Sequence, residues 1–145
     1  SFNDEEVRNI FNEYVRDGML FLAKSSAGDV IGFGAALPFR KAPDIAQKLE
    51  IRGSDLDCTW YMADLGVKDE LRNQGIGRSL VVTRLNQLSG NTVVMRTSVD
   101  NNASRSLYGS LGFVQIPNVS QIVDRDRTIE GLPTTDKRIF MSKRL

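Results

Sequence analysis

The sequence predicts a mixed α/β sheet built around a central parallel crossover. The deciding pattern is a strand, a helix and a second strand in succession between Cys58 and Val99. The second strand, 92–99 (TVVMRTSV), is mostly β-branched, as expected of a strand that is buried on both faces. Two strands joined by one helix pair in parallel through a right-handed crossover. Short apolar runs before and after this unit predict further strands, so the sheet is mixed.

The residues before this unit predict a helix, a hairpin and a second, short helix. Apolar residues recur at helical spacing up to Gly18, and Asn3 with Glu6 forms a capping-box-like pair at the start. Two apolar runs around the turn residues SSAGD predict the hairpin, and Pro43 suits the first position of the short helix. In chain order, these elements are the helix after Asn3, strands over 19–23 and 30–36 closed by Pro38, a helix over 43–51 and a polar loop over 52–57.

The central unit and the residues after it complete the sheet. The crossover helix carries an apolar face at helical spacing, and SGN after it ends the helix. No internal repeat or low-complexity linker divides the chain, so residues 1–145 are expected to form one domain. In chain order, the elements are a strand over 58–67, a helix over 76–88, a strand over 92–99, a helix over 103–111, extended segments over 113–116 and 119–123 broken at Pro117, a charged, turn-rich stretch over 124–138 and a strand over 138–143.

The composition excludes several kinds of chemistry. The chain of 145 residues has no histidine and one cysteine, Cys58. A serine–histidine–aspartate triad, an imidazole metal site, an internal disulfide and a thiolate zinc cluster are therefore excluded, and no metal site is expected. Acid–base chemistry falls to carboxylates, tyrosine, lysine, backbone groups or water. Cys58 itself is expected to be a small apolar strand residue.

Charge and hydropathy bear on partners and location. The chain has 19 basic and 18 acidic residues, which gives no electrostatic support for binding nucleic acid or a membrane surface. No apolar run approaches the ~20 residues that a membrane span needs. The first residues, SFNDEE, are acidic and polar, unlike a secretory signal. We therefore expect a cytoplasmic protein without nucleic-acid or membrane partners.

A glycine-containing turn joins the central strand to the crossover helix. Its sequence, RNQGIGR over 72–78, precedes a helix N-terminus, where free N–H groups and the helix dipole attract phosphate. A P-loop would need glycine and lysine where this chain has Arg72 and Arg78. A dinucleotide-binding fingerprint would need glycine in place of Leu80. Because glycines are common at such turns, the loop alone leaves a structural role and a phosphate site equally open.

A second motif gives the chain a resemblance to a known family. Residues 72–77 match the pattern Arg/Gln-x-x-Gly-x-Gly/Ala at every specified position. Downstream, Asn101 leads to the pair Leu107-Tyr108, and the stretch ends in LGF over 111–113. The two motifs are separated by one helix and one buried strand. In this order they resemble the acetyl-CoA-binding motif and the downstream motif of the GNAT superfamily of N-acetyltransferases, over roughly residues 60–113.

The resemblance implies a fold and a cofactor site. The sheet of the family is mixed and mostly antiparallel, with a central parallel pair splayed into a V and flanked by helices. Acetyl-CoA, as co-substrate, lays its pantetheine arm in this gap, against the backbone of Leu65, Gly66 and Val67. Asn101 is expected to hydrogen-bond the arm. The pyrophosphate is expected to lie on the loop formed by Arg72, Asn73, Gln74, Gly75, Ile76, Gly77 and Arg78.

The resemblance also implies a reaction, the transfer of an acetyl or another short acyl group from CoA to a primary amine by direct attack. A backbone N–H on the splayed strand can stabilise the oxyanion that forms. Tyr108 is expected to protonate the leaving thiolate, since a phenol of pKa ~10 can donate a proton to a thiolate whose conjugate thiol has a pKa of about 8.5. The structural alternative for Tyr108 is a packed aromatic ring beside Leu107 and Leu111.

The base that takes a proton from the incoming ammonium is less defined. Asp64 is the leading candidate, and strand alternation places it on the face opposite Leu65. An ordinary surface carboxylate, or a partner for a neighbouring arginine, is an equal interpretation of Asp64. Asp55 and Asp57 are weaker candidates, and a chain of water molecules is a further alternative.

Departures from the family pattern leave the acceptor open. Arg96 stands where the branch that acetylates protein N-termini often places a base, and we expect the first strand of the family to be absent or truncated. A small-molecule or peptide amine is expected, with specificity set by 37–57 and by the charged loop 120–138. The alternative function is a non-catalytic acyl-CoA-binding or sensor domain, and an interaction module with a vestigial pocket is less favoured. Either a monomer or a homodimer is compatible with the sequence.

Overall fold

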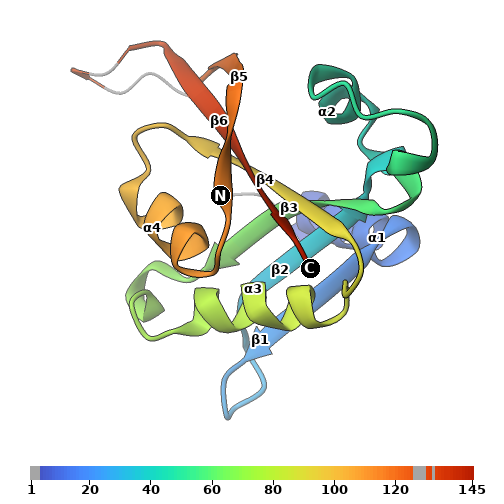
Figure 1. Cartoon of the computed structure of the whole chain (residues 1–145). Helices are drawn as coiled ribbons and strands as arrows, with labels where there is room; N and C mark the ends of the chain where they lie inside the picture. The colour runs from blue at the N-terminus through green and yellow to red at the C-terminus, as the bar shows by residue number, and fades with distance from the viewer. Residues whose placement is uncertain (1–3, 126–129, 132) are drawn as a thin grey trace.

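The described part of the chain forms a six-stranded sheet with helices on both faces (Figure 1). The structure is a computed structural model and describes residues 4–125, 130–131 and 133–145. The strands lie in the order β1-β2-β3-β4-β6-β5. Their bounds are β1 Met19–Lys24, β2 Val30–Pro38, β3 Thr59–Val67, β4 Thr92–Ser98, β5 Val114–Asp124 and β6 Thr135–Arg144. The helices are α1 Asp4–Asp17, α2 Pro43–Lys48, α3 Ile76–Asn86 and α4 Asn102–Ser110, with 3-10 turns η1 Phe39–Lys41, η2 Gly53–Asp57 and η3 Asp69–Leu71.

β3 and β4 are the central pair of the sheet. They run parallel and are joined through α3, whereas every other neighbouring pair of strands is antiparallel. β4 is buried on both faces, since Val93 and Val94 are 0% and 2% exposed. The predicted mixed sheet with a central parallel crossover is therefore confirmed.

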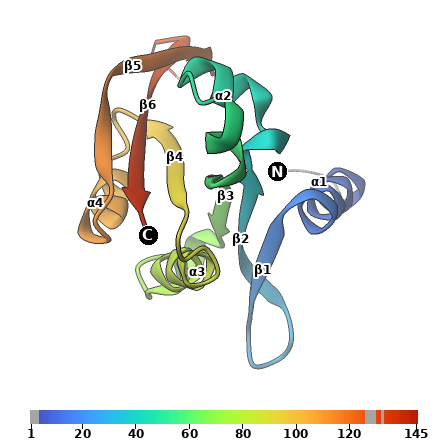
Figure 2. The ribbon, with the colours of Figure 1, turned by 45° about the vertical axis from the view of Figure 1, so that its right-hand side comes forward.

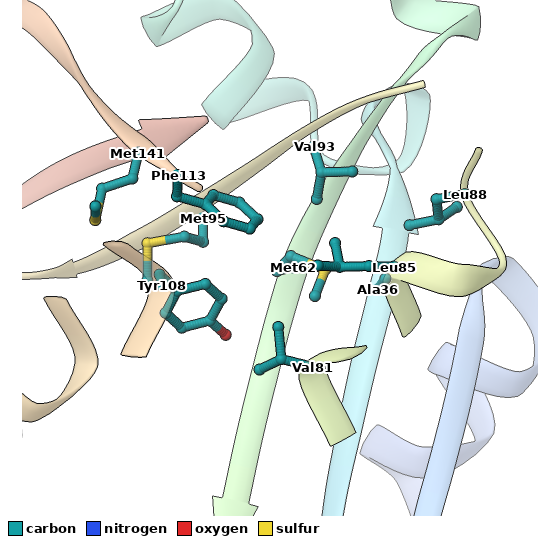
Figure 3. Close-up of a cluster of buried hydrophobic side chains, with 10 residues drawn as sticks. All are labelled: Ala36, Met62, Val81, Leu85, Leu88, Val93, Met95, Tyr108, Phe113 and Met141. Carbon is teal, nitrogen blue, oxygen red and sulfur yellow. The ribbon is translucent and has the colours of Figure 1, made fainter. Parts of the chain in front are cut away.

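Each face of the sheet has its own apolar core. On one face, α3 and α4 enclose a cluster that includes Met62, Val81 and Tyr108 (Figure 3). The helices α1 and α2 lie on the other face (Figure 2). Tyr14 of α1 packs against β2, and Ile45 of α2 packs against β4 and β6. Because neighbouring residues of a strand point to opposite faces, each central strand contributes to both cores.

β3 and β4 separate part-way along their length. Their pairing goes no further than Met62 opposite Met95. At the same point the register between β2 and β3 shifts: Met62 and Asp64 lie opposite consecutive residues of β2, so Ala63 is an extra residue, a β-bulge. A bulge bends its strand and ends pairing, and here it coincides with the start of the gap. The central pair is therefore splayed, as the family resemblance implied.

The C-terminal strands differ from the expectation in two details. β5 is a single strand through Pro117, and the break appears only in its pairing, because residues 116–119 have no partner in β6. β6 begins at Thr135, so the expected turn-rich stretch over 124–138 is too long. Asp136 and Lys137 pair with β5, and these long-range partners extend the strand despite its charged sequence.

Three further expectations concern Cys58, the N-terminal cap with the charged loop, and membrane spans. Cys58 is exposed and lies just before β3, so its interpretation as an apolar strand residue is wrong. The expected cap Asn3 lies outside the described residues, as do 126–129 of the charged loop. Among the described helices, none has the length and apolar character needed to cross a membrane.

Candidate functional site

A cleft of about 390 Å³ opens where β3 and β4 separate. It passes between the two faces of the sheet, because its lining includes Tyr108 from the α3–α4 face and Arg96 from the opposite one. The cleft is lined by 61–65 of β3, by 95–98 of β4, and by Asn101, Ser104, Tyr108 and Arg138.

The turn at the N-terminus of α3 presents a row of free backbone N–H groups. Among the described residues, no N–H of 73–78 donates to a backbone or side-chain acceptor, and the first helical bond runs from Ser79 to Gly75. Asn73 and Gly75 have φ values of 65° and 82°, a left-handed conformation that turns successive N–H groups toward one side. Together with the positive end of the helix dipole, this turn is suited to bind a phosphate or pyrophosphate.

The two arginines of the motif support this turn from its sides. The Nε of Arg72 donates to the carbonyl of Val67 at 3.4 Å, and its Nη2 pairs with Asp69 at 2.9 Å. The Nη1 of Arg78 donates to the Oγ of Ser110 on α4 at 2.9 Å. These contacts tie the turn to the end of β3 and to α4.

The end of β3 lies beside the turn and has no strand neighbour on the β4 side. The side chains of Leu65 and Val67 point toward α3, because a Cβ on Gly77 would lie 3.9 Å from each of them. Backbone N–H and C=O groups of β3 beyond Met62 that point toward β4 are therefore available to a ligand in the gap.

Asn101 occupies the start of α4 at the edge of the cleft. Its Oδ1 caps the helix by accepting from the N–H of Ser104 at 3.0 Å. The amide nitrogen of the Asn101 side chain donates to no described residue. It remains available as a donor at the cleft.

Tyr108 points into the cleft from α4 and is 4% exposed. Its ring packs edge-on against Phe113, at 5.2 Å between centroids, and its hydroxyl points to the side where Met62 and Val81 lie (Figure 3). Burial raises the pKa of Tyr108 above its ordinary value, and the positive charge of Arg84 opposes this rise. The phenol therefore keeps its proton at neutral pH.

Arg84 is a fully buried cation on α3, next to Tyr108. Its Nη1 donates to the carbonyl of Ala35 at 2.7 Å and to that of Asp64 at 3.2 Å, which clamps β2 to β3 at the bulge. Its Nη2 has no hydrogen-bond partner among the described residues. Gly34 makes the room, because a Cβ there would lie 2.9 Å from the Nε of Arg84.

Asp64 presents its carboxylate on the α1 side of β3, opposite Leu65, as strand alternation predicted. It accepts a hydrogen bond from the hydroxyl of Tyr14 on α1. Burial and this bond raise the pKa of Tyr14, so the tyrosine remains a donor. Asp57 forms an exposed ion pair with Arg40, and neither Asp57 nor Asp55 lines the cleft.

The other charged side chains of the cleft belong to β4 and β6. The Nη1 of Arg96 donates to the Oε1 of Gln121 on β5 at 2.7 Å. The Nε of Arg138 donates to Asp136 at 2.7 Å, and the Oγ of Ser98 donates to the same carboxylate at 2.7 Å. Asp136 is 5% exposed. Burial opposes its ionisation, but these bonds and the nearby arginines outweigh it and lower its pKa.

A larger hollow of about 660 Å³ lies elsewhere, between η1, α2 and η2. It is lined by side chains such as Phe39, Gln47 and Leu56, and by none of the residues expected to bind a cofactor. The chemically equipped cavity is the smaller cleft between β3 and β4.

Comparison with known proteins agrees with this geometry. The sequence profile of the Acetyltransferase (GNAT) family matches residues 1–113, more than three quarters of the chain. The chain belongs to the GNAT acetyltransferase family. A search of curated proteins finds no matching relative.

Solved structures of acetyltransferases share the fold. The ribosomal-protein-alanine N-acetyltransferase of Brucella melitensis has a TM-score of 0.67 at 21% identity, over 99% of this chain and 80% of that one. An acetyltransferase of Bacillus subtilis in complex with CoA has a TM-score of 0.65 at 19% identity, over 100% and 94%. The IAA acetyltransferase of Bacillus cereus has a TM-score of 0.63 at 21% identity, over 98% and 87%. At these identities the likeness concerns the GNAT fold alone.

The structure brings the predicted residues of this GNAT protein to one place. Asn101, Tyr108, Asp64 and Leu65 line the cleft, and the loop 72–78 lies at the end of β3 that borders it. Their individual roles toward a ligand remain predictions.

Sequence reasoning missed the side chains that support this GNAT cleft from neighbouring elements. A signal existed for Arg84, which lies four residues from both Leu80 and Leu88 and so shares their apolar face. Tyr14, Gln121 and Asp136 had no such local signal, because only the register of the sheet and the packing of α1 bring them into contact with the residues that line the cleft.

Proposed function

We propose that this protein transfers an acetyl group from acetyl-CoA to a primary amine, by direct attack of the amine in the cleft between β3 and β4. The observation that carries the proposal is the row of N–H groups over 73–78 that have no partner among the described residues, placed at the open end of a splayed strand pair. Membership of the GNAT family supports acetyl transfer in general, and the cleft supplies the groups that such a transfer needs.

The cofactor side of the cleft is suited to acetyl-CoA. The N–H groups of 73–78 would hold the pyrophosphate, and the free backbone edge of β3 at Leu65, Gly66 and Val67 would hold the pantetheine arm. The side-chain amide of Asn101 would donate to the same arm. The thioester of acetyl-CoA supplies the acyl group and a thiolate leaving group.

Tyr108 and Asp64 are the proposed proton carriers. Tyr108 keeps its proton at neutral pH and lines the cleft, so its O–H can stabilise and protonate the leaving thiolate. Asp64 lies on the opposite face of the strand pair, where its carboxylate can take a proton from an ammonium that enters from the α1 side. The hydroxyl of Tyr14 fixes the orientation of that carboxylate.

The proposal is tested by measuring acetyl-CoA binding and amine-dependent release of CoA separately. Isothermal titration should give binding at tens of micromolar acetyl-CoA or below, and a panel of small and peptide amines should release CoA with acetylated product detected by mass. Absence of binding contradicts the proposal. Binding without turnover on any amine supports instead the alternative, a non-catalytic acyl-CoA-binding or sensor domain.

A further inference from the structure

Arg96 stands at the opening of the cleft, on the face of the sheet opposite α3. It directly follows Met95, the last β4 residue paired with β3. Val93 and Met95 pack toward α3 and α4 and Val94 toward α2, so alternation along β4 places Arg96 on the α2 side. Its contact with Gln121 reaches across β6 to β5. The guanidinium is therefore held at the acceptor side of the cleft.

The charge of Arg96 has no counter-ion in the described part of the chain. No described carboxylate lies within 4.0 Å of its guanidinium, which contacts the neutral amide of Gln121 and the phenol of Tyr61. A guanidinium has five N–H donors, so several remain unused. Arg96 is partly buried, and a cation at such a site without a counter-ion among the described residues is poised to bind an anion.

The other charged side chains of the cleft are either paired with an opposite charge or are negative, unlike Arg96. Arg138 is paired with the buried carboxylate of Asp136. Asp64 is the carboxylate among the lining residues, and it bonds to Tyr14 instead of Arg96. Tyr61 interacts electrostatically with Arg96, Arg138 and Asp64, so the cationic and the anionic parts of this surface lie close to one phenol.

The phosphates of CoA do not account for this cation. The N–H groups suited to them lie at the N-terminus of α3, on the other face of the sheet. An acceptor that presents an ammonium to Asp64 can at the same time present an anion to Arg96. A planar carboxylate matches the fork of a guanidinium through two parallel hydrogen bonds.

We propose that the acceptor is an amine that also carries a carboxylate, and that Arg96 binds this carboxylate with Tyr61 beside it. This inference rests on the proposed acetyl transfer, because only that reaction makes the ligand an acceptor. Free amino acids and the C-termini of short peptides share the required chemistry. The role of Arg96 is to set substrate specificity, while the proton transfers remain with Tyr108 and Asp64.

The first test compares matched acceptors on the unaltered protein. L-Alanine, β-alanine, 4-aminobutyrate and 5-aminopentanoate vary the spacing between amine and carboxylate, and each is paired with its carboxamide. At least one acid should have a kcat/KM about 10- to 100-fold above its amide, the effect of losing one charge-assisted contact. A tripeptide with a free or an amidated C-terminus distinguishes a peptide source from a free amino acid. Equal kcat/KM for every acid and its amide overturns the inference.

The second test assigns the preference to Arg96. Arg96→Gln should raise KM for the preferred acid about 10- to 100-fold and leave that of its amide within about threefold, and Arg96→Lys should restore part of the loss. Arg144→Gln is the matched control, because Arg144 is exposed and pairs with Thr92 at the other end of β4. Acetyl-CoA titration of each variant verifies that it folds. An equal loss for acid and amide contradicts the assignment.

Binding of the product separates this inference from the proposed function. The N-acetylated acid and the N-acetylated amide are titrated in the presence of CoA, so that no turnover is needed. Acid-selective binding that disappears in Arg96→Gln supports the carboxylate site even if no amine is consumed. In that case only the proposed acetyl transfer is overturned. Turnover of amines with no acid-selective binding retains the transfer and overturns the carboxylate site.

Discussion

The two sides of the cleft are built from different material. The side proposed to bind the cofactor consists of backbone: the N–H groups of 73–78 and the free edge of β3 beyond Met62. The side proposed to bind the acceptor consists of side chains from several elements, among them Tyr14, Asp64 and Arg96. A backbone surface tolerates exchange of many side chains but not added bulk, whereas a surface of side chains can change its ligand by single substitutions. Single substitutions on the side proposed to bind the acceptor could therefore change the acceptor without changing the proposed cofactor site.

Tyr108 lies where the two sides meet, and its replacement should have the largest effect. Tyr108→Phe removes the proposed proton donor while keeping the ring against Phe113. We expect kcat to fall by about 10²-fold or more, with the Kd for acetyl-CoA within about twofold. Steady-state kinetics and isothermal titration measure the two effects. Unaltered turnover over the whole pH range would remove the assigned acid.

Asp64 tests the acceptor side alone. Asp64→Asn should lower kcat/KM at neutral pH by about 10- to 100-fold, because the amide cannot accept the proton of the ammonium. Asp57→Asn is the matched control, since Asp57 is exposed, is paired with Arg40 and lies outside the cleft lining. If both variants lose the same activity, or neither does, the base is not Asp64.

Gly77 tests the cofactor side by adding bulk. The new Cβ of Gly77→Ala makes only ordinary contacts with Leu65 and Val67, and alanine favours the helix, so the variant should fold. We expect acetyl-CoA to bind about tenfold more weakly, because a methyl group hinders close approach to the N–H groups. Gly109→Ala, in open space on α4, should leave this affinity unchanged. Affinity retained in both variants contradicts a backbone phosphate site at the turn.

Replacing Asp136 tests how the side chains on the acceptor side are held in place. We expect the replacement to lower the stability of the protein. Asp136→Asn leaves Arg138 and Arg125 without their carboxylate, and we expect a loss of about 1–3 kcal/mol in the free energy of unfolding. The lowered pKa of Asp136 means that its contribution is present above pH ~4 and lost as the pH falls through its folded value. Chemical denaturation at pH 7 and pH 3 should therefore show a smaller difference from the wild type at the lower pH. A difference independent of pH contradicts this role.

The backbone features of the site could be predicted from the sequence, whereas the contacts between distant side chains could not. The β3–α3–β4 unit, the turn and α4 follow from local patterns of glycine and apolar residues, and the structure confirms them. The bulge at Ala63 depends on register with β2, and the bond between Arg96 and Gln121 depends on the pairing of three strands. Such contacts join residues far apart in the chain, so local patterns carry no sign of them. The early start of β6 at Thr135 was missed for the same reason.

The turn over 73–78 and the open edge of β3 are together proposed to bind acetyl-CoA. The most direct test is to titrate acetyl-CoA into ¹⁵N-labelled protein and follow the backbone N–H resonances. We expect the largest shifts at 73–78 and along β3 beyond Met62, with the resonances around Gln47 and Leu56 unmoved. Shifts confined to the hollow beside α2, or none at 73–78, would contradict this binding mode.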